Sequence, residues 1–148
     1  MGKDTVLIQC GGRSDGFSVS MGKLLSSRLG GKLILVGTDC ELEQVSKFIE
    51  MSDVVVFACP VVSSEIFYPF WTIIDSLHKS DKAAVLVVAA GKSRFFCNKS
   101  INNAMKAIRA LGFSPVTSII VDNTYQLVKG EFSPKHLRRL EKASKLIL

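Results

Sequence analysis

The sequence predicts an α/β three-layer sandwich: a doubly wound parallel sheet of five strands, in the order 2-1-3-4-5, with helices on both faces. Two patterns in the 148 residues predict it. Five short aliphatic runs alternate with five longer segments of helical periodicity. The runs are apolar at successive positions, which is typical of strands covered on both faces. Because crossovers between parallel strands are right-handed, a chain of this length with five strands favours this order.

The expected strands are rich in Val, Ile and Leu, residues that favour extended backbone. The first contains Val6-Leu7-Ile8, and the third is apolar from Val54 to Cys59. We expect Pro60 to end the third strand, because proline fixes the turn that follows. The five strands are expected at residues 5–10, 32–37, 53–59, 83–90 and 115–121.

Each expected helix carries apolar side chains three or four residues apart, which gives it one apolar face. In the second helix, Leu42, Val45 and Ile49 share that face. Gly30 and Gly112 follow the first and fourth helices, where glycine commonly ends a helix. The helices are expected at residues 18–29, 41–51, 66–78, 98–111 and 134–148.

Length and composition indicate one globular domain, residues 1–148, without repeats or linkers. A hydrophobic content of 47% with 22% charged residues excludes a disordered chain, a collagen-like repeat and a disulfide-framework miniprotein. The longest apolar runs are far shorter than the roughly 20 residues that cross a bilayer, and residues 1–4 do not resemble a signal peptide. We therefore expect a cytoplasmic protein without a membrane partner.

The net charge of +6 suits nucleic acid, a phosphorylated ligand or simply a solvated surface. Basic residues are spread along the chain, with one denser stretch near its end. Their helical spacing there is typical of a solvated helix face, so nucleic acid is the less favoured partner. The stretch contains Lys135, Arg138, Arg139, Lys142 and Lys145.

The predicted strand order opens a crevice beyond the carboxyl ends of the first and third strands, which is where open α/β sheets bind ligands. Residues 11–17, 60–65 and 91–97 would line it. The first of these loops holds three glycines and leads into a helix, whose first amide groups favour an anion. Arg13, Ser14 and Ser18 would add donors, so we predict a phosphomonoester there. The simpler interpretation is a tight turn with Ser18 as the helix N-cap.

The other two loops combine glycine, cations and aromatic residues. The second is followed by an aromatic cluster, which predicts either a flat wall for a planar ring or ordinary core and subunit contacts. The third places Lys92 and Arg94 near Phe95 and Phe96. It predicts either a contact with a ring and an anion, or a basic loop whose phenyl rings fold back on the core. The aromatic cluster consists of Phe67, Tyr68, Phe70 and Trp71.

In three places the sequence resembles the NADPH-dependent FMN reductase branch of the flavodoxin-like superfamily. Residues 11–18 and the Lys23-Leu24 that follows are similar to that family's Gly-Ser…Ser-Phe-Asn phosphate loop, with one residue fewer. Residues 60–77 resemble its Pro-Glu-Tyr-Asn-Gly-Ser-Ile…Ala-Leu-Asp-Trp-Leu segment in unbroken register. Residues 87–91 are similar to the segment that carries its glycine-rich loop after the fourth strand.

The resemblance implies a flavodoxin-like oxidoreductase that binds FMN and uses NAD(P)H to reduce a flavin, quinone or similar small-molecule acceptor. Residues 13–18 would hold the phosphate, residues 60–64 the ring and ribityl chain, and Gly91 with its followers the far edge of the ring. The implied FMN residues are Gly12, Arg13, Ser14, Gly16, Phe17, Ser18, Pro60, Val61, Val62, Ser63, Ser64, Gly91, Lys92 and Ser93. No catalytic residue is assigned, since the cofactors carry the hydride chemistry.

The chain departs from that family's pattern at three positions. Val62 replaces a ring-contacting Tyr, Ser64 replaces a Gly, and Gly12 stands where a Ser donates to phosphate. The alternative is a flavodoxin-like domain that has lost the cofactor and acts as a non-enzymatic binding or assembly module. The aromatic cluster after the second loop also indicates a homodimer or a higher homo-oligomer.

The four cysteines fall at the carboxyl edge of the first four predicted strands, and their spacing contains no Cys-x-x-Cys. We therefore expect buried apolar cysteines rather than a thiol or metal site, and no metal is predicted. The two histidines, His78 and His136, do not suggest a pair. The cysteines are Cys10, Cys40, Cys59 and Cys97.

Overall fold

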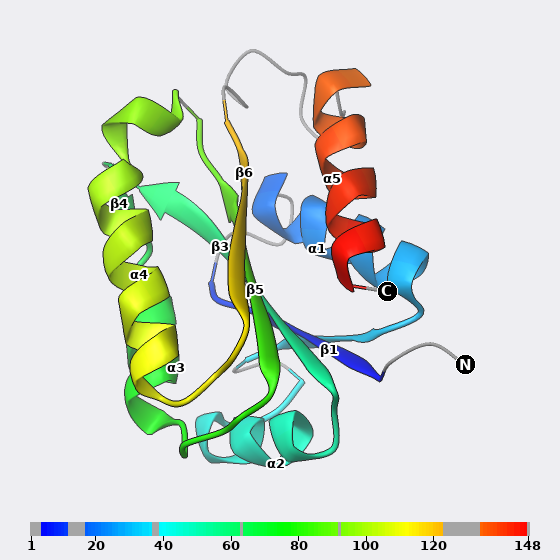
Figure 1. Cartoon of the computed structure of the whole chain (residues 1–148), viewed down its shortest axis with the longest axis vertical. Coiled ribbons are helices and arrows are strands. Elements are labelled where there is room, and N and C mark those ends of the chain that lie inside the picture. Colours follow the sequence, from blue (N-terminus) through cyan, green and yellow to red (C-terminus); the bar gives the residue numbers. More distant parts are fainter. Residues whose placement is uncertain are drawn as a thin grey trace.

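The computed structural model describes residues 4–11, 17–36, 39–62, 64–91, 93–122 and 134–147. Five parallel strands form the sheet, in the order β2-β1-β3-β5-β6, which confirms the predicted order (Figure 1). They are β1 (Thr5–Gln9), β2 (Lys32–Leu35), β3 (Val54–Val62), β5 (Ala83–Ala89) and β6 (Val116–Val121).

A sixth strand, β4 (Glu65–Ile66), pairs antiparallel with the end of β3. The expectation that Pro60 ends the third strand is therefore wrong. Proline lacks an N–H, but the Pro60 carbonyl accepts a hydrogen bond from the Phe67 amide at 3.0 Å. Beyond it, Val61 and Val62 pair with Ile66 and Glu65. The predicted loop at residues 60–65 is thus a hairpin.

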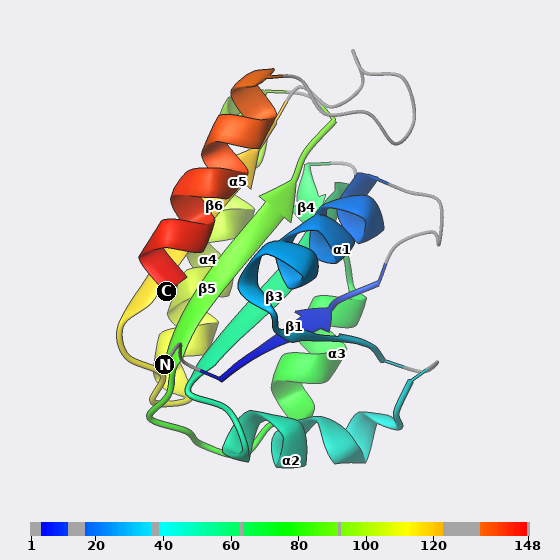
Figure 2. The ribbon, with the colours of Figure 1, turned by 90° about the vertical axis from the view of Figure 1, so that its right-hand side faces the viewer.

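Two layers of helices cover the sheet, as predicted. α1 (Phe17–Leu29) and α5 (Pro134–Ile147) lie side by side on one face, as Figure 2 shows. The other face carries α2 (Val45–Glu50), α3 (Pro69–Ser76) and α4 (Asn98–Ala110). Two short 3₁₀ turns, η1 (Leu42–Gln44) and η2 (Arg94–Phe96), lead into α2 and toward α4.

The third helix is shorter than residues 66–78. It begins at Pro69, because a proline in the first turn leaves no helical hydrogen bond unmade, and Ile66 instead belongs to β4. The backbone N–H of His78 donates to the Ser46 hydroxyl at 3.3 Å, so His78 lies beyond the helix. The second predicted helix is divided into η1 and α2.

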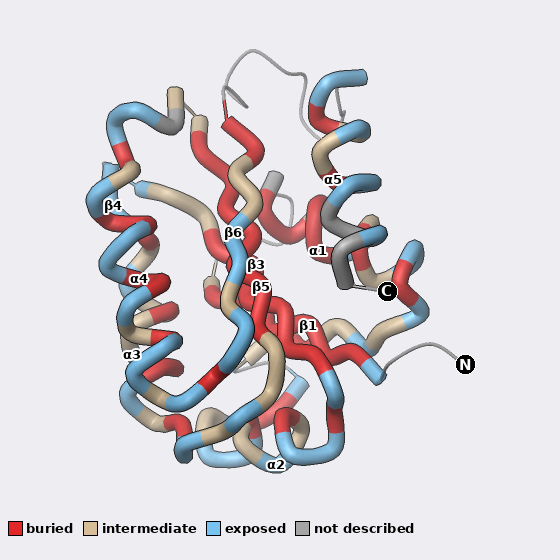
Figure 3. The backbone as a smooth tube through the Cα atoms, viewed as in Figure 1, coloured by how far each residue is buried: buried red, intermediate tan, exposed pale blue. Residues whose placement is uncertain are grey.

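The core consists of two apolar layers, one on each face of the sheet (Figure 3). The inner strands β1, β3 and β5 are buried over most of their length, whereas the edge strands β2 and β6 are mostly half-buried or exposed. Phe57 in β3 centres the larger layer, with edge-to-face ring contacts to Phe70 of α3 at 6.1 Å and to Phe113 at 6.0 Å. Leu140 of α5 is fully buried in the other layer. Among the described residues, no helix is long and apolar enough to span a membrane.

Candidate cofactor site at the carboxyl edge of the sheet

The three segments predicted to bind a ligand all leave the sheet at its carboxyl edge. Gly11 follows β1, the β3–β4 hairpin extends from β3, and Gly91 follows β5. Backbone hydrogen bonds continue the sheet to this edge, from the Cys10 amide to the Ala58 carbonyl at 2.8 Å and from the Ala90 amide to the Val121 carbonyl at 2.9 Å.

Gly11 brings the first segment into contact with the second. Its φ is +84°, in the left-handed region that favours glycine. A Cβ atom there would lie 2.8 Å from Cγ of Pro69 and 2.9 Å from Cδ2 of Phe67. Any side chain at this position would clash with the segment after the hairpin. Only glycine therefore allows the first loop to lie this close to that segment.

A buried amide side chain joins the end of β1 to the start of α1. Nε2 of Gln9 donates to the Gly11 carbonyl at 3.0 Å and to the Ser18 hydroxyl at 2.8 Å. Gln9 and Ser18 are 3% and 4% exposed. Sequence reasoning missed Gln9, although a single amide in an otherwise apolar strand was the available signal. Ser18 lies in the first turn of α1, not before it, so the N-cap interpretation is wrong.

The electrostatics of this helix start favour an anion. The first turn of α1 contains no acidic residue, so nothing within it offsets the partial positive charge of the helix N-terminus. Arg28 lies in the last turn, where a cation is favoured, and pairs with Glu141 of α5 at 3.3 Å. The charges within α1 therefore do not oppose an anion at its first turn.

The β3–β4 hairpin forms the second part of the site. Pro60 and Val61 are half-buried, and Val62 is 49% exposed. Ser64 adopts a φ of +66°, the only described residue other than glycine in the left-handed region. The position where the resembled family has glycine therefore keeps a backbone conformation that glycine favours.

The third segment presents two phenyl rings outward. Phe95 and Phe96 are 77% and 61% exposed, and their rings meet edge to face at 5.8 Å. Ser93 orders the turn: its hydroxyl accepts from the Phe95 amide at 3.3 Å and its carbonyl from the Phe96 amide at 3.2 Å. The alternative in which these rings fold back on the core is wrong.

The aromatic cluster after the hairpin divides between core and surface. Phe70 is fully buried, as the core interpretation expects, and Trp71 packs on it with ring centroids 5.0 Å apart. Tyr68 is 70% exposed, and its ring lies 5.1 Å from that of the half-buried Phe67. Only part of this cluster is therefore available to a ligand or a partner.

The cysteines are buried, as expected. Cys10, directly after β1, and Cys59, in the adjacent strand β3, are completely buried. Burial raises the pKa of the Cys59 thiol well above its ordinary value, and a hydrogen bond with Cys10 and the nearness of that thiol raise it further. Burial, then Asp39 and Glu41, also raise the pKa of Cys40. Both effects keep these groups as neutral thiols, and thiolate is the form that binds metals. Within the described ranges, no three His, Cys, Asp or Glu residues gather as a metal site would require.

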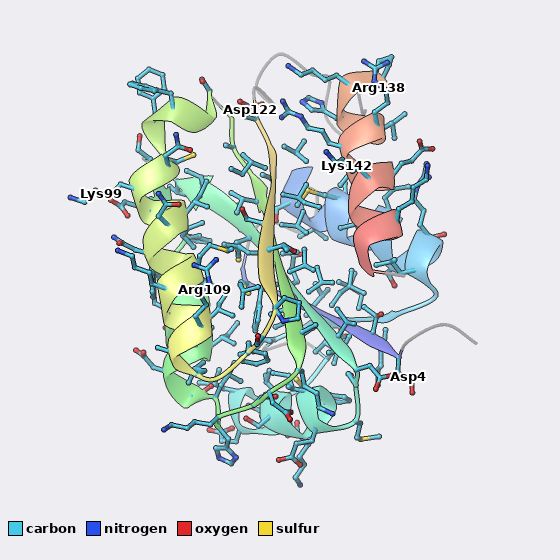
Figure 4. All side chains as sticks on the ribbon, viewed as in Figure 1. Asp4, Lys99, Arg109, Asp122, Arg138 and Lys142 are labelled. Atoms are coloured by element: carbon cyan, nitrogen blue, oxygen red, sulfur yellow. The ribbon has the colours of Figure 1, made fainter. Side chains whose placement is uncertain are left out.

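A polar network at the end of β6 was not predicted. Nη1 of Arg139 donates to Oδ1 of Asp122 at 2.7 Å and to the Ile120 carbonyl at 2.9 Å. Nε2 of His136 lies 2.7 Å from the Asp122 carbonyl and, since a carbonyl only accepts, carries the hydrogen. Figure 4 shows Asp122 where β6 ends, level with the first turns of α5. One residue of the basic stretch, Arg139, thus serves the fold, while Lys135, Arg138, Lys142 and Lys145 are exposed.

Part of the predicted site lies outside the described residues. The structure places Ser18, Pro60, Val61, Val62, Ser64, Gly91 and Ser93, all in the three segments at the carboxyl edge. The remaining predicted residues, Gly12, Arg13, Ser14, Gly16, Ser63 and Lys92, and the side chain of Phe17 are not described.

No protein-family model matches the chain, and no curated protein matches its sequence. Its structure, however, matches solved structures over nearly its whole length. The Trp repressor binding protein of Bacillus subtilis has a TM-score of 0.77 at 14% identity, covering 98% of both chains. The flavodoxin, WrbA-like protein of Agrobacterium tumefaciens has a TM-score of 0.76 at 12% identity, covering 99% of this chain and 95% of that one. The chain has the flavodoxin-like fold.

An FMN-dependent NADH-azoreductase from Bacillus anthracis, solved in complex with FMN, shares this flavodoxin-like fold. Its TM-score is 0.72 at 11% identity, and the match covers 100% of both chains. At such identities, the similarity to these three proteins is one of fold.

Proposed function

We propose that this flavodoxin-like protein binds FMN at the carboxyl edge of its sheet and uses NAD(P)H to reduce a flavin, quinone or similar small acceptor. The observation that carries the proposal is the presence of Gly11 and Ser18 at the two ends of the β1–α1 connection. Gly11 has left-handed backbone and Ser18 opens an acid-free helix turn, which together suit a phosphate group.

The described residues fit the cofactor. Ser18 offers a hydroxyl group beside the N-terminal amide groups of α1, and these donors suit a dianionic phosphate. The hairpin residues Pro60, Val61 and Val62 offer a largely apolar surface for the isoalloxazine ring. Gly91 and Ser93 follow the adjacent strand β5 and face the same edge of the sheet.

When bound, FMN would supply the redox chemistry that links oxidation of NAD(P)H to reduction of the acceptor. The chain's own residues bind and orient it. Ser18 and the α1 amides would hold the phosphate, and the apolar side chains of the β3–β4 hairpin would contact the ring and exclude water from it. The left-handed Ser64 preserves the turn on which this hairpin depends.

Direct binding and turnover measurements test the proposal. We expect the purified protein to bind FMN with a change in the visible flavin bands, and the complex to oxidise NADH or NADPH when a quinone is added. A protein that binds no FMN would instead be the non-enzymatic module. FMN binding without nicotinamide oxidation would retain the site and refute the reductase.

Two glycine variants make this test specific. Gly11→Ala would clash with Phe67 and Pro69, whereas Gly30→Ala, also in the left-handed region at φ +67°, would meet nothing within 4 Å. Both variants strain the backbone, but only Gly11→Ala is expected to abolish FMN binding. Equal FMN affinity in the two variants would remove Gly11 from the site.

We further propose that residues 1–148 act as a single domain in the cytoplasm and form a homo-oligomer. Exposed Tyr68 and half-buried Trp71 on and beside α3 support self-association, because exposed aromatic rings favour burial against a partner. Light scattering after size-exclusion chromatography would give the mass, and a monomer at all concentrations would exclude the oligomer.

A further inference from the structure

We propose that Gln9 is a positioning residue that orients the Ser18 hydroxyl toward the cofactor phosphate and fixes both ends of the phosphate loop. The inference rests on the proposed function, since it assigns a role at the same site. It is independent of the family resemblance, which assigns nothing to Gln9. Three observations carry it: the orientation of the Gln9 amide, the hydrogen-bonding state of Ser18 and the contact of Gln9 with Gly22.

The orientation of the Gln9 amide follows from its neighbours. The carbonyl of Gly11 can only accept a hydrogen bond, and it lies 3.0 Å from the Gln9 side chain. The amide nitrogen, not the oxygen, must therefore face Gly11. The same nitrogen lies 2.8 Å from Oγ of Ser18, so its second hydrogen points at the hydroxyl. Both amide hydrogens are used, and they bridge the residue before the loop to the helix after it.

The donation from Gln9 determines what Ser18 can do. A hydroxyl group has one hydrogen to donate and two lone pairs that accept. Since Oγ accepts from Gln9, the Ser18 hydrogen points elsewhere, and no described residue accepts it. That hydrogen lies at the electropositive start of α1, where a phosphate oxygen is the acceptor with the strongest attraction. Gln9 thus converts Ser18 into a directed donor.

The oxygen of the same amide makes no hydrogen bond that would stabilise the fold among the described residues. Oε1 is buried and has no hydrogen-bond partner among the described residues, an arrangement that destabilises a fold. It lies against α1 at Gly22, where an added Cβ would come within 2.7 Å of it. The helix accommodates the amide by carrying glycine there, although glycine is unfavourable inside a helix. Both features are explained by a functional role for Gln9.

The test compares two ligands that differ only by the phosphate. Gln9→Met keeps a side chain of similar volume but cannot donate, so the affinity for FMN should fall about tenfold to a hundredfold, the effect of one or two hydrogen bonds that hold a charged group. Riboflavin has no phosphate, and its affinity should stay unchanged. The midpoint of urea unfolding should change little, because removal of the unpartnered buried oxygen offsets the loss of the two hydrogen bonds that Gln9 donates. Fluorescence quenching gives both dissociation constants.

Two serine variants on α1 provide the matched control. Ser18→Ala should weaken FMN binding as Gln9→Met does. Ser26→Ala removes a serine that donates to the Gly31 carbonyl at 2.5 Å, at the other end of the same helix, and should leave FMN affinity unchanged. Since Gln9 acts in part through Ser18, the double variant Gln9→Met with Ser18→Ala should lose less FMN affinity than the sum of the two single losses.

The outcomes separate this inference from the proposed function. If the unmodified protein binds neither FMN nor riboflavin, the proposed function fails and this inference fails with it. If it binds FMN and Gln9→Met binds equally well, only the positioning role is overturned. A parallel loss of FMN and riboflavin affinity in Gln9→Met would also overturn it, because that pattern marks general damage to the fold.

Discussion

The two edges of the sheet differ in how many polar side chains they bury. Of the seven polar or charged residues that are buried in the described part of the chain, five lie at the carboxyl edge and two at the amino edge. The five are Gln9, Ser18, Ser100, Asp122 and His136, and the two are Thr5 and Ser52. A parallel sheet covered by helices does not by itself require more buried polar residues at one edge than at the other.

The amino edge is closed by its own backbone. The Asp4 carbonyl accepts from the amides of Asp53 and Val54 at 2.7 and 3.1 Å, and the Lys82 carbonyl accepts from that of Ser114 at 3.0 Å. These backbone bonds satisfy the turns with fewer buried polar side chains than the carboxyl edge contains. At the carboxyl edge, side chains such as that of Gln9 make hydrogen bonds with the ends of the connection between β1 and α1. The Oε1 atom of Gln9 has no hydrogen-bond partner among the described residues. The difference agrees with the proposed function, in which the amino edge serves stability and the carboxyl edge would bind the cofactor.

The largest expected effect is on stability alone, at the amino edge. Phe113 is 2% exposed and meets Phe57 edge to face, so Phe113→Ala should lower the free energy of unfolding by about 3–5 kcal/mol. Urea unfolding measures this change. The folded fraction should keep its FMN affinity. A loss of that affinity would contradict the proposal that only the carboxyl edge takes part in binding.

A smaller loss is expected for the ion pair at the carboxyl edge. Asp122→Ala leaves Arg139 without its carboxylate partner, and the buried position of Asp122 makes this cost about 2 kcal/mol. Glu141→Gln is the matched control, because its pair with Arg28 is exposed and should contribute less than about 1 kcal/mol. Thermal unfolding of both variants compares them, and equal losses would contradict the importance of burial.

The third effect depends on pH. Because the pKa of Cys59 is raised in the folded state, both states keep this proton below about pH 8.5, and the thiol has no influence there. At higher pH the unfolded chain loses the proton while the folded protein keeps it. The free energy of unfolding should then fall by up to about 1.4 kcal/mol per pH unit, until the folded pKa is reached.

Cys59→Ala identifies the source of that pH dependence. The variant should flatten the fall in unfolding free energy between about pH 8.5 and 10, measured in urea at several pH values. An unchanged slope would assign it to other groups. Slow reaction of Cys10 and Cys59 with an alkylating reagent in the native protein would agree with their burial, and fast reaction would support the thiol site instead.

The smallest effect compares left-handed residues at the two edges. Left-handed backbone usually requires glycine. Gly30, before β2 at the amino edge, agrees with this rule, whereas Ser64 at the carboxyl edge does not. Ser64→Gly should raise the free energy of unfolding by about 0.5–1 kcal/mol, because the strain at φ +66° is relieved. Gly30→Ala should lower it by about 1 kcal/mol. A destabilised Ser64→Gly would show that the serine side chain, rather than the backbone, shapes the hairpin.

Most of the fold was predictable because the spacing of apolar residues along the sequence indicates which positions are buried. The runs around Val56 and Val87 are covered on both faces, and this alone favours a parallel sheet. The hairpin after β3 was missed for a local reason. Proline usually ends a strand, but Pro60 needs only its carbonyl group for the pairing that follows.

The parts of the candidate site that depend on the backbone were the most predictable. Gly11, Gly91 and the hairpin position Ser64 follow from chain direction and glycine placement. The contacts of Gln9 and the network around Asp122 could not be predicted, because each joins residues from different elements whose proximity depends on the tertiary fold. The exposure of Phe95 and Phe96 is likewise decided by a turn that periodicity does not describe.

The most direct test of the account is a calorimetric titration of the unmodified protein with FMN, beside one with riboflavin. The account predicts one FMN per chain, bound at least about tenfold more tightly than riboflavin, because the start of α1 and Ser18 hold the phosphate. Equal affinity for the two ligands, or no heat of binding with FMN at about 1 mM, a concentration that detects even an affinity of about −4 kcal/mol, would contradict a phosphate site at the carboxyl edge.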